Sequence, residues 1–135
     1  MTQNDALHAF FSDFVEAFAS FDGQRVASRY AQPYLALNAE GELRVFATAG
    51  ETAAYFQQVL DAYAALGCRS CRFAALEVVI LGADSLLASV TWELLDAAGL
   101  VLRSWRESYN LTQRSEGLFI YASTDHVASL ERPYH

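Results

Sequence analysis

The sequence predicts an α+β fold, in which helices pack on one face of a curved antiparallel sheet. The first half of the chain mixes helical and strand patterns, whereas the rest, from about residue 72, has the pattern of four long strands joined by short turns. All seven glycines fall between periodic segments, where turns and helix ends require them. The 135 residues fit one domain, with a core at about 5–126 and a tail at 127–135.

Three helices are expected. The first is capped by Asn4 or Asp5, ends at Asp22-Gly23, and carries an apolar stripe at i, i+3, i+4 and i+7 spacing. The stripe consists of Leu7, Phe10, Phe11, Phe14, Phe18 and Phe21. It either faces the core, which we favour, or forms a lipid or cofactor site. A short second helix covers about 24–31 and is stopped by Pro33, and a third opens at Thr48 with capping-box spacing.

The strands follow from runs of β-branched and aromatic residues between turn signals. Two short strands precede the third helix, and four long ones follow it, separated by short Gly- and Asp-containing turns. The expected strands are 34–38, 42–47, 72–81, 86–95, 100–112 and 118–125. The predicted order of elements is therefore α-α-β-β-α-β-β-β-β.

Alternation of side chains along the strands leaves two registers open for strand 100–112. If Leu95 pairs with Leu100, the odd-numbered residues of this strand join the inner apolar face. If Gly99 instead forms a one-residue bulge, the two sets exchange faces. We favour the first register because it keeps the bulky aromatics inside. The inner side chains are then Arg103, Trp105, Glu107 and Tyr109, with Phe119, Tyr121, Ser123 and Asp125 on the last strand.

Charged side chains on the inner face imply a polar, partly hydrated cavity in which they pair, because an isolated buried charge is costly. Glu107 and Asp125 would be near neighbours on adjacent strands, and two close carboxylates raise one pKa unless an arginine neutralises them. Arg103 would either form an internal ion pair with Glu107 or orient a carboxylate or carbonyl of a ligand.

The late pattern RSWRESYNL…EGLFIYASTDH, together with the order of elements and the Phe stripe, resembles the nuclear transport factor 2-like superfamily. The resemblance covers about residues 5–126, and the motif positions fall on Arg106, Tyr109, Gly117 and Phe119, followed by Asp125 or His126. Phe119 replaces the more usual Trp. This superfamily has the cone-shaped cystatin-like fold and includes ketosteroid isomerases, polyketide cyclases and scytalone dehydratase.

The resemblance implies a cone whose open end admits a small hydrophobic molecule, with an acid–base Asp or an Asp/His pair inside. The catalytic candidates are Asp125 and His126; since adjacent strand residues face opposite ways, only one can line the cavity. The ligand-binding candidates are Tyr30, Tyr34, Tyr55, Trp92, Arg103, Trp105, Glu107, Tyr109 and Tyr121. The expected function is binding of this molecule, with isomerase, dehydratase or cyclase chemistry that needs no cofactor. The alternative is a non-catalytic dimeric interaction or accessory module.

By the same analogy a homodimer is expected through the outer sheet face. The side chains of that face are small and polar, so the interface would contain water molecules between the two copies. Its residues are Ser89, Thr91, Ser104, Arg106, Ser108 and Thr124.

Composition argues against several other classes of function. The net charge of −7 and the absence of a basic run disfavour nucleic-acid binding, and the absence of lysine excludes a lysine Schiff base. No apolar run is long enough for a membrane helix, so a cytoplasmic protein is expected. Cys68 and Cys71 are expected to be reduced thiols, and the three histidines lack metal-ligand spacing.

Overall fold

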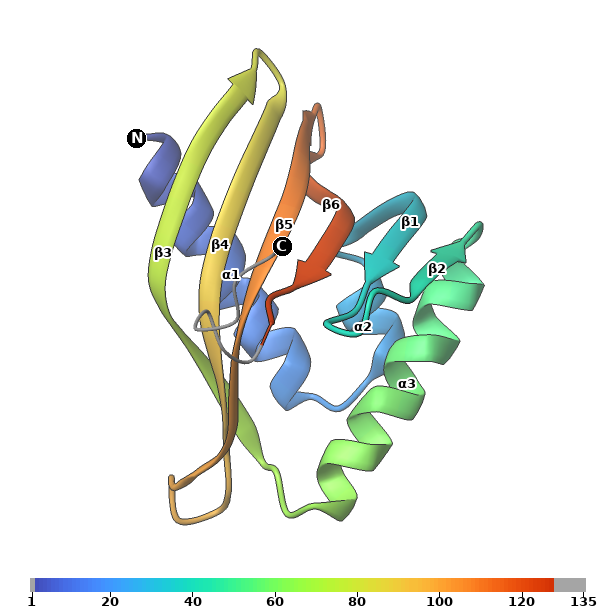
Figure 1. The fold of residues 1–135 in the computed structure, drawn as a ribbon, viewed down its shortest axis with the longest axis vertical. Helices are drawn as coiled ribbons and strands as arrows, with labels where there is room; N and C mark the ends of the chain where they lie inside the picture. Colours follow the sequence, from blue (N-terminus) through green and yellow to red (C-terminus); the bar gives the residue numbers. More distant parts are fainter. Residues whose placement is uncertain (1, 128–135) are drawn as a thin grey trace, which may run out of the picture.

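The structure, a computed structural model, describes residues 2–127. It confirms the α+β class and the predicted order of elements (Figure 1). The helices are α1 (Gln3–Ala19), α2 (Gly23–Ala27) and α3 (Ala49–Ala65). The strands are β1 (Tyr30–Leu37), β2 (Leu43–Phe46), β3 (Ser70–Gly82), β4 (Ser85–Leu95), β5 (Val101–Arg114) and β6 (Gly117–Asp125). All but the first residue of the predicted tail, 127–135, lies outside the described residues.

One curved sheet contains all six strands in the order β2-β1-β6-β5-β4-β3. Neighbouring strands are antiparallel except β1 and β6, which run parallel. Figure 1 shows the long strands β3, β4 and β5 on one side, α3 on the other, and α1 passing behind the long strands. The space between the sheet and α3 is where the candidate site lies.

The Phe stripe of α1 faces the core. Leu7, Phe10, Phe11, Phe14 and Phe18 are all buried. Phe11 is fully buried, with its ring centroid 5.7 Å from that of Phe73 and 5.6 Å from that of Tyr109. The predicted cap was wrong, because Thr2 is the N-cap and forms a capping box with Asp5. Phe21 lies beyond the end of α1 and is only partly buried.

The second helix ends four residues earlier than predicted, and Pro33 lies inside a strand instead of stopping a helix. Main-chain pairing with β6 explains this, because the Ile120 N–H donates to the Arg29 carbonyl and Tyr30 pairs with Ile120. Pro33 falls in the interruption of that ladder between Tyr30 and Leu35, where its missing N–H costs no ladder bond.

The register of β4 and β5 confirms the favoured face assignment. Trp92 pairs with Trp105 and Val90 pairs with Glu107, so the odd-numbered residues of β5 from Arg103 onward share the inner face. The exact pairing was wrong, since Leu95 pairs with Val101. A bulge therefore does exist, but it lies at the turn end of β5 and leaves the site residues on the predicted face.

A second bulge corrects the prediction for β6. Asn110 pairs with Ala122 but Leu111 pairs with Ile120, which leaves Tyr121 as the extra residue. The inner side chains of β6 before the bulge are therefore Leu118 and buried Ile120, in place of Phe119 and Tyr121. Ser123 and Asp125, after the bulge, keep their predicted face.

Gly23 is the point of closest approach between α2 and α3. A Cβ there would lie 2.4 Å from the Ala53 carbonyl oxygen and 2.7 Å from the Gln57 nitrogen, so a backbone would have to move. Gly23→Ala is expected to lower the free energy of unfolding by about 2 kcal/mol. In the control Gly50→Ala, the nearest atom is 3.9 Å away, and stability should stay equal or rise by up to about 1 kcal/mol. Urea unfolding measures both, and equal stability of the two variants would contradict this packing.

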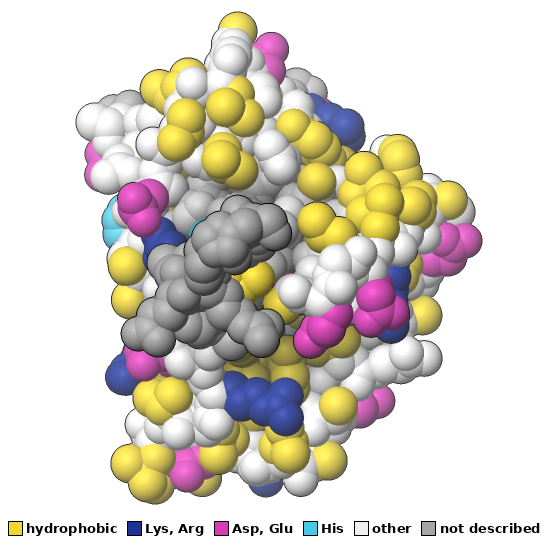
Figure 2. All heavy atoms as spheres, viewed as in Figure 1, with side chains coloured by type: hydrophobic (Ala, Val, Ile, Leu, Met, Phe, Trp, Pro, Cys, Tyr) yellow, Lys and Arg dark blue, Asp and Glu magenta, His cyan; other side chains and the backbone are white. Residues whose placement is uncertain are grey.

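Within residues 2–127, no helix is long and apolar enough to cross a membrane. Figure 2 shows that one face of the molecule carries hydrophobic patches with acidic and basic side chains scattered between them. On the face shown, basic side chains are not gathered into a continuous surface of the kind that nucleic-acid phosphates require.

Candidate functional site

A cavity of about 870 Å³ lies between the concave face of the sheet and the helices. This volume is within the range of small-molecule sites. Aromatic residues from α1, α3 and the inner faces of β1, β4 and β5 form a large part of its walls. The aromatic residues are Phe14, Phe18, Tyr30, Tyr34, Tyr55, Phe56, Tyr63, Trp92, Trp105 and Tyr109.

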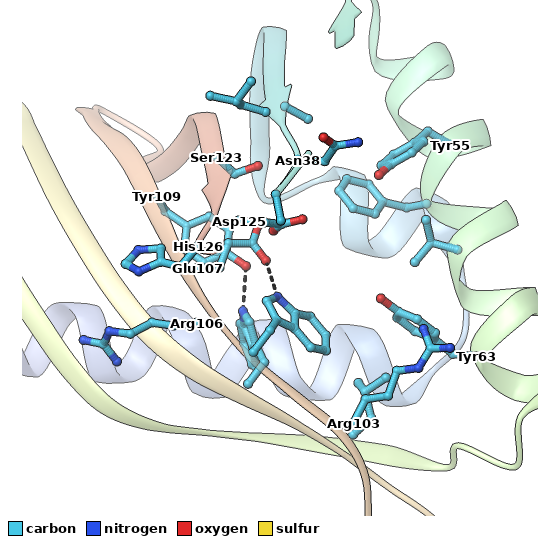
Figure 3. A pocket seen from close by; sticks show the side chains of 18 of the residues that line it. Asn38, Tyr55, Tyr63, Arg103, Arg106, Glu107, Tyr109, Ser123, Asp125 and His126 are labelled. Atoms are coloured by element: carbon cyan, nitrogen blue, oxygen red, sulfur yellow. Dashed lines mark hydrogen bonds between the residues drawn. The ribbon is translucent and has the colours of Figure 1, made fainter. Parts of the chain in front are cut away.

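Two carboxyl groups lie together in this aromatic wall. Glu107 of β5 pairs in register with Asp125, the last residue of β6, and both side chains point into the cavity (Figure 3). Because directly opposed residues on antiparallel strands share a face, the sequence alternation that turns Glu107 inward also brings Asp125 beside it. The structure thus forms the carboxyl pair that the strand pattern predicted.

Neighbouring side chains hold Glu107 in place. The Trp105 indole N–H donates to Glu107 Oε1 at 2.9 Å, and Tyr109 lies two residues further along the same face of β5. The Trp92 indole N–H donates to the Tyr109 hydroxyl at 2.7 Å, so Tyr109 is itself oriented. These contacts fix the position of the Glu107 carboxyl relative to the cavity.

Burial and the neighbouring Asp125 raise the pKa of Glu107 to about 8, although the donors Trp105 and Tyr109 oppose the shift. Burial also raises the pKa of Asp125, while its hydrogen bond with Glu107 acts in the opposite direction. The pair therefore shares one proton at neutral pH, and we place it on Glu107, the more deeply buried member. Asp125 is then the ionised member and can accept a proton.

Tyrosine hydroxyls surround the carboxyl pair. The Tyr34 hydroxyl lies 2.5 Å from Ser123 Oγ, and the rings of Tyr30 and Tyr34 are 4.5 Å apart. Burial is the main cause that raises the pKa values of Tyr30, Tyr34 and Tyr55. All three stay protonated at neutral pH and can donate to a ligand oxygen.

Of the two roles expected for Arg103, the internal ion pair with Glu107 does not form within residues 2–127. Arg103 is exposed at the edge of the cavity, beside Tyr63 (Figure 3), and forms no ion pair within residues 2–127. The two residues share a face but are four positions apart, roughly 13 Å along a strand, with Trp105 between them. Asp125, on the adjacent strand, takes the place of Arg103 beside Glu107.

Asp125 is the last residue of β6, and His126 follows just beyond the strand. The expectation that only one of them lines the cavity was wrong, because both border it. The His126 ring borders the cavity opening, but its Nε2 lies 2.7 Å from Ser108 Oγ on the outer face. The backbone N–H of His126 also donates to the backbone carbonyl of Arg106 at 2.9 Å. Of the two catalytic candidates, Asp125 is therefore the one that joins Glu107.

Most of the predicted ligand-binding residues line the cavity, namely Tyr30, Tyr34, Tyr55, Trp92, Arg103, Trp105, Glu107 and Tyr109. Tyr121 does not, because the bulge in β6 turns it away. Tyr63, which was not among the predicted ligand-binding residues, lines the cavity from α3. A signal was present, since Tyr63 lies eight residues after Tyr55 and so on the same helix face.

The two cysteines are free thiols and both are buried. Cys71 lines the cavity, but burial raises the pKa of its thiol to about 12, so it is not a thiolate nucleophile at neutral pH. In the part of the chain that the structure describes, no group of His, Cys, Asp and Glu side chains could hold a metal ion.

A curved sheet that encloses an aromatic cavity with helices defines the class of cystatin-like α+β cones. Within this class the chain belongs to the family described as NTF2-like protein (DUF6841), whose family model matches residues 4–127. No curated protein matches the sequence.

Solved structures with low sequence identity share this fold. A domain of unknown function with a cystatin-like fold from Nostoc punctiforme has a TM-score of 0.74 at 21% identity, over 98% of this chain and 83% of that one. An NTF2-like protein from Novosphingobium aromaticivorans has a TM-score of 0.74 at 11% identity, over 94% and 82%. A ketosteroid isomerase-like protein from Erwinia carotovora atroseptica has a TM-score of 0.67 at 17% identity, over 93% and 95%.

Proposed function

We propose that this protein binds a small hydrophobic molecule in its cavity and acts on it by acid–base chemistry of the isomerase, dehydratase or cyclase type. The observation that carries the proposal is the Glu107–Asp125 pair, two directly opposed carboxyl groups inside the cavity, whose pKa values are both raised by burial. The likeness to the ketosteroid isomerase-like protein adds support at the level of the fold.

The pair suits proton transfer at a carbon next to a carbonyl group. The Asp125 carboxylate accepts the proton from that carbon, and the electron pair of the broken C–H bond moves onto the carbonyl oxygen as an enolate. Tyr30 or Tyr55 donates a hydrogen bond to this oxygen. Return of the proton from Asp125 to another carbon completes an isomerisation. In a dehydration, the electron pair of the enolate instead forms a C=C bond as the β-hydroxyl leaves, and the proton from Asp125 is transferred to that hydroxyl, which departs as water.

Filling the cavity is expected to weaken ligand binding strongly. Val59 of α3 lines the cavity, so Val59→Trp should weaken binding of the fluorescent probe 2-naphthol at least about tenfold, because the indole occupies the ligand's space. The matched control is Val79→Trp, at a position on β3 that is 52% exposed. Fluorescence titration measures both affinities. Equal binding by wild type and Val59→Trp, or no binding of the probe by wild type, would contradict a ligand-binding cavity.

We also propose that the protein works in the cytoplasm as a homodimer, joined through the outer face of β4 and β5. The polar groups of this face bond to one another: Ser89 Oγ lies 2.6 Å from Ser108 Oγ, and Arg106 donates to Thr91 Oγ1 at 3.1 Å. Such a polar surface, whose groups already bond to one another, can pair with a second copy through water-mediated contacts. Sedimentation velocity should give a dimer, and Thr91→Arg a monomer, whereas a monomeric wild type would contradict the proposal.

A further inference from the structure

We infer that the ligand is a ring compound with a terminal carboxylate, which Arg103 and Tyr63 bind at the edge of the cavity while the rings extend to the carboxyl pair. This inference rests on the proposed function and names its ligand class. It follows from the position of Arg103, the distribution of charge around the cavity, and the distance between Arg103 and Glu107.

Arg103 differs from the neighbouring arginine of the same strand. Arg106 pairs with Glu77 and donates to Thr91 on the outer face, so its charge is already matched. Arg103 lines the cavity, is exposed, and forms no ion pair within residues 2–127. Figure 3 shows it reaching from β5 towards α3. A guanidinium in this position can bind a carboxylate through two parallel hydrogen bonds.

Tyr63 supplies a second donor at the same place. The positive charge of Arg103 acts on the Tyr63 hydroxyl, yet burial raises the pKa of Tyr63 to about 12 and keeps it protonated. The ring centroids of Tyr63 and Trp105 are 6.4 Å apart. Arg103, Tyr63 and Trp105 therefore combine one cation, one hydroxyl donor and an apolar ring surface, which suits a carboxylate attached to an aromatic or alicyclic ring.

The acidic groups of the cavity lie at the other end. Glu40 raises the pKa of Asp125, which places a further negative charge near the carboxyl pair. A ligand carboxylate would be repelled from that end and attracted to Arg103. The other unpaired arginine of the described cavity lining, Arg44, has its guanidinium 5.7 Å from the centroid of the Tyr55 ring. Arg44 is thus the alternative cation that could bind a ligand carboxylate, and its replacement is the control for that of Arg103.

Strand geometry sets the length of the ligand. Arg103 and Glu107 lie on one uninterrupted stretch of β5, with Trp105 between them on the same face. Their Cα atoms are roughly 13 Å apart, the length of four strand residues. A single small acid cannot reach both. Two fused rings with a terminal carboxylate can lie over Trp105, and the side chains of Arg103 and Glu107 cover the rest of this backbone distance.

The test compares two probes that differ by one carboxylate, 6-hydroxy-2-naphthoate and 2-naphthol, by fluorescence titration of the full chain at pH 7. Wild type is expected to bind the naphthoate about tenfold more tightly than the naphthol, as a charge-assisted hydrogen-bond pair allows. Arg103→Met should reduce this ratio to about one. Arg44→Met should keep it near tenfold. The ratio in wild type should also decrease as salt is added, because the mouth is open to solvent.

Equal affinities of wild type for the two probes would overturn the inference while leaving the proposed function intact. Loss of the preference in Arg44→Met but not in Arg103→Met would also overturn it. Failure of wild type to bind either probe would contradict the proposed function and the inference together. Circular dichroism spectra that match wild type confirm that each variant is folded.

Discussion

Replacing Asp125 with Asn is expected to slow the exchange of the α-hydrogens of 2-tetralone for deuterium by about 100-fold or more. This ketone is a neutral two-ring probe, and its exchange requires a base to remove a proton from carbon. Asp125 faces the cavity and is the member of the carboxyl pair to which we assign the negative charge, whereas the Asn amide cannot accept a proton. General bases of this kind contribute about 10²- to 10⁴-fold. Proton NMR in D₂O follows the loss of signal directly.

Two further variants make this experiment decisive. Asp13→Asn changes an exposed carboxyl of α1 in the same way and should exchange at the wild-type rate. His126→Gln tests the other sequence-predicted catalytic candidate, whose ring is bonded to Ser108 on the outer face. A rate that falls in His126→Gln but not in Asp125→Asn would contradict the assignment of the base. Exchange no faster with wild type than in buffer alone would contradict acid–base function.

Replacing Glu107 with Gln is expected to remove part of the pH dependence of the free energy of unfolding. The pKa of Glu107 is about 8 in the folded protein, against an ordinary 4.5. The folded state therefore holds a proton that the unfolded chain releases between these values, and stability falls as pH rises through the interval. The full shift corresponds to at most about 5 kcal/mol, and access of water through the cavity mouth reduces the expected loss to about 2–3 kcal/mol.

Gln is close to isosteric with protonated Glu and can keep the hydrogen bonds from Trp105 and to Asp125. Glu107→Gln should thus match wild type at pH 5 and exceed its unfolding free energy by about 2 kcal/mol at pH 9. A smaller slope should remain, because the pKa of Asp125 is raised as well. Urea unfolding at several pH values measures this, with the exposed-site variant Glu16→Gln as control. If the unfolding free energies of wild type and Glu107→Gln changed with pH in parallel, the raised pKa of Glu107 would be contradicted.

The fold could be predicted from the sequence because its signals are local. The Phe stripe of α1 has helical periodicity, the long strands alternate, and short turns force neighbours in sequence to pair. The same alternation predicted that Glu107 and Asp125 meet on the inner face, as they do. This agreement depends on the bulge in β6. The pairing near the turn, Gln113 with Leu118, would continue to Glu107 with Thr124, and the extra residue Tyr121 shifts the register so that Asp125 lies opposite Glu107.

The errors arose where the backbone departs from regular pairing. The bulge in β6 removes Tyr121 from the cavity, and no Gly or Pro marks that position in the sequence. The ion pair considered between Arg103 and Glu107 does not form, because two residues that share a strand face are not in contact when they lie four positions apart. The roles of the two carboxyl groups also depend on burial, which only the packing of Trp105, Tyr109 and the surrounding helices determines.

The protonation state of Glu107 at neutral pH decides whether the cavity holds a working acid–base pair. Carbon-13 NMR of protein labelled at the glutamate side-chain carboxyls measures it directly, with the Glu107 signal assigned as the one missing from Glu107→Gln. A titration midpoint near pH 8 is predicted, from burial and the adjacent Asp125. A midpoint near 4.5, the ordinary value for a glutamate, would contradict the proposed site.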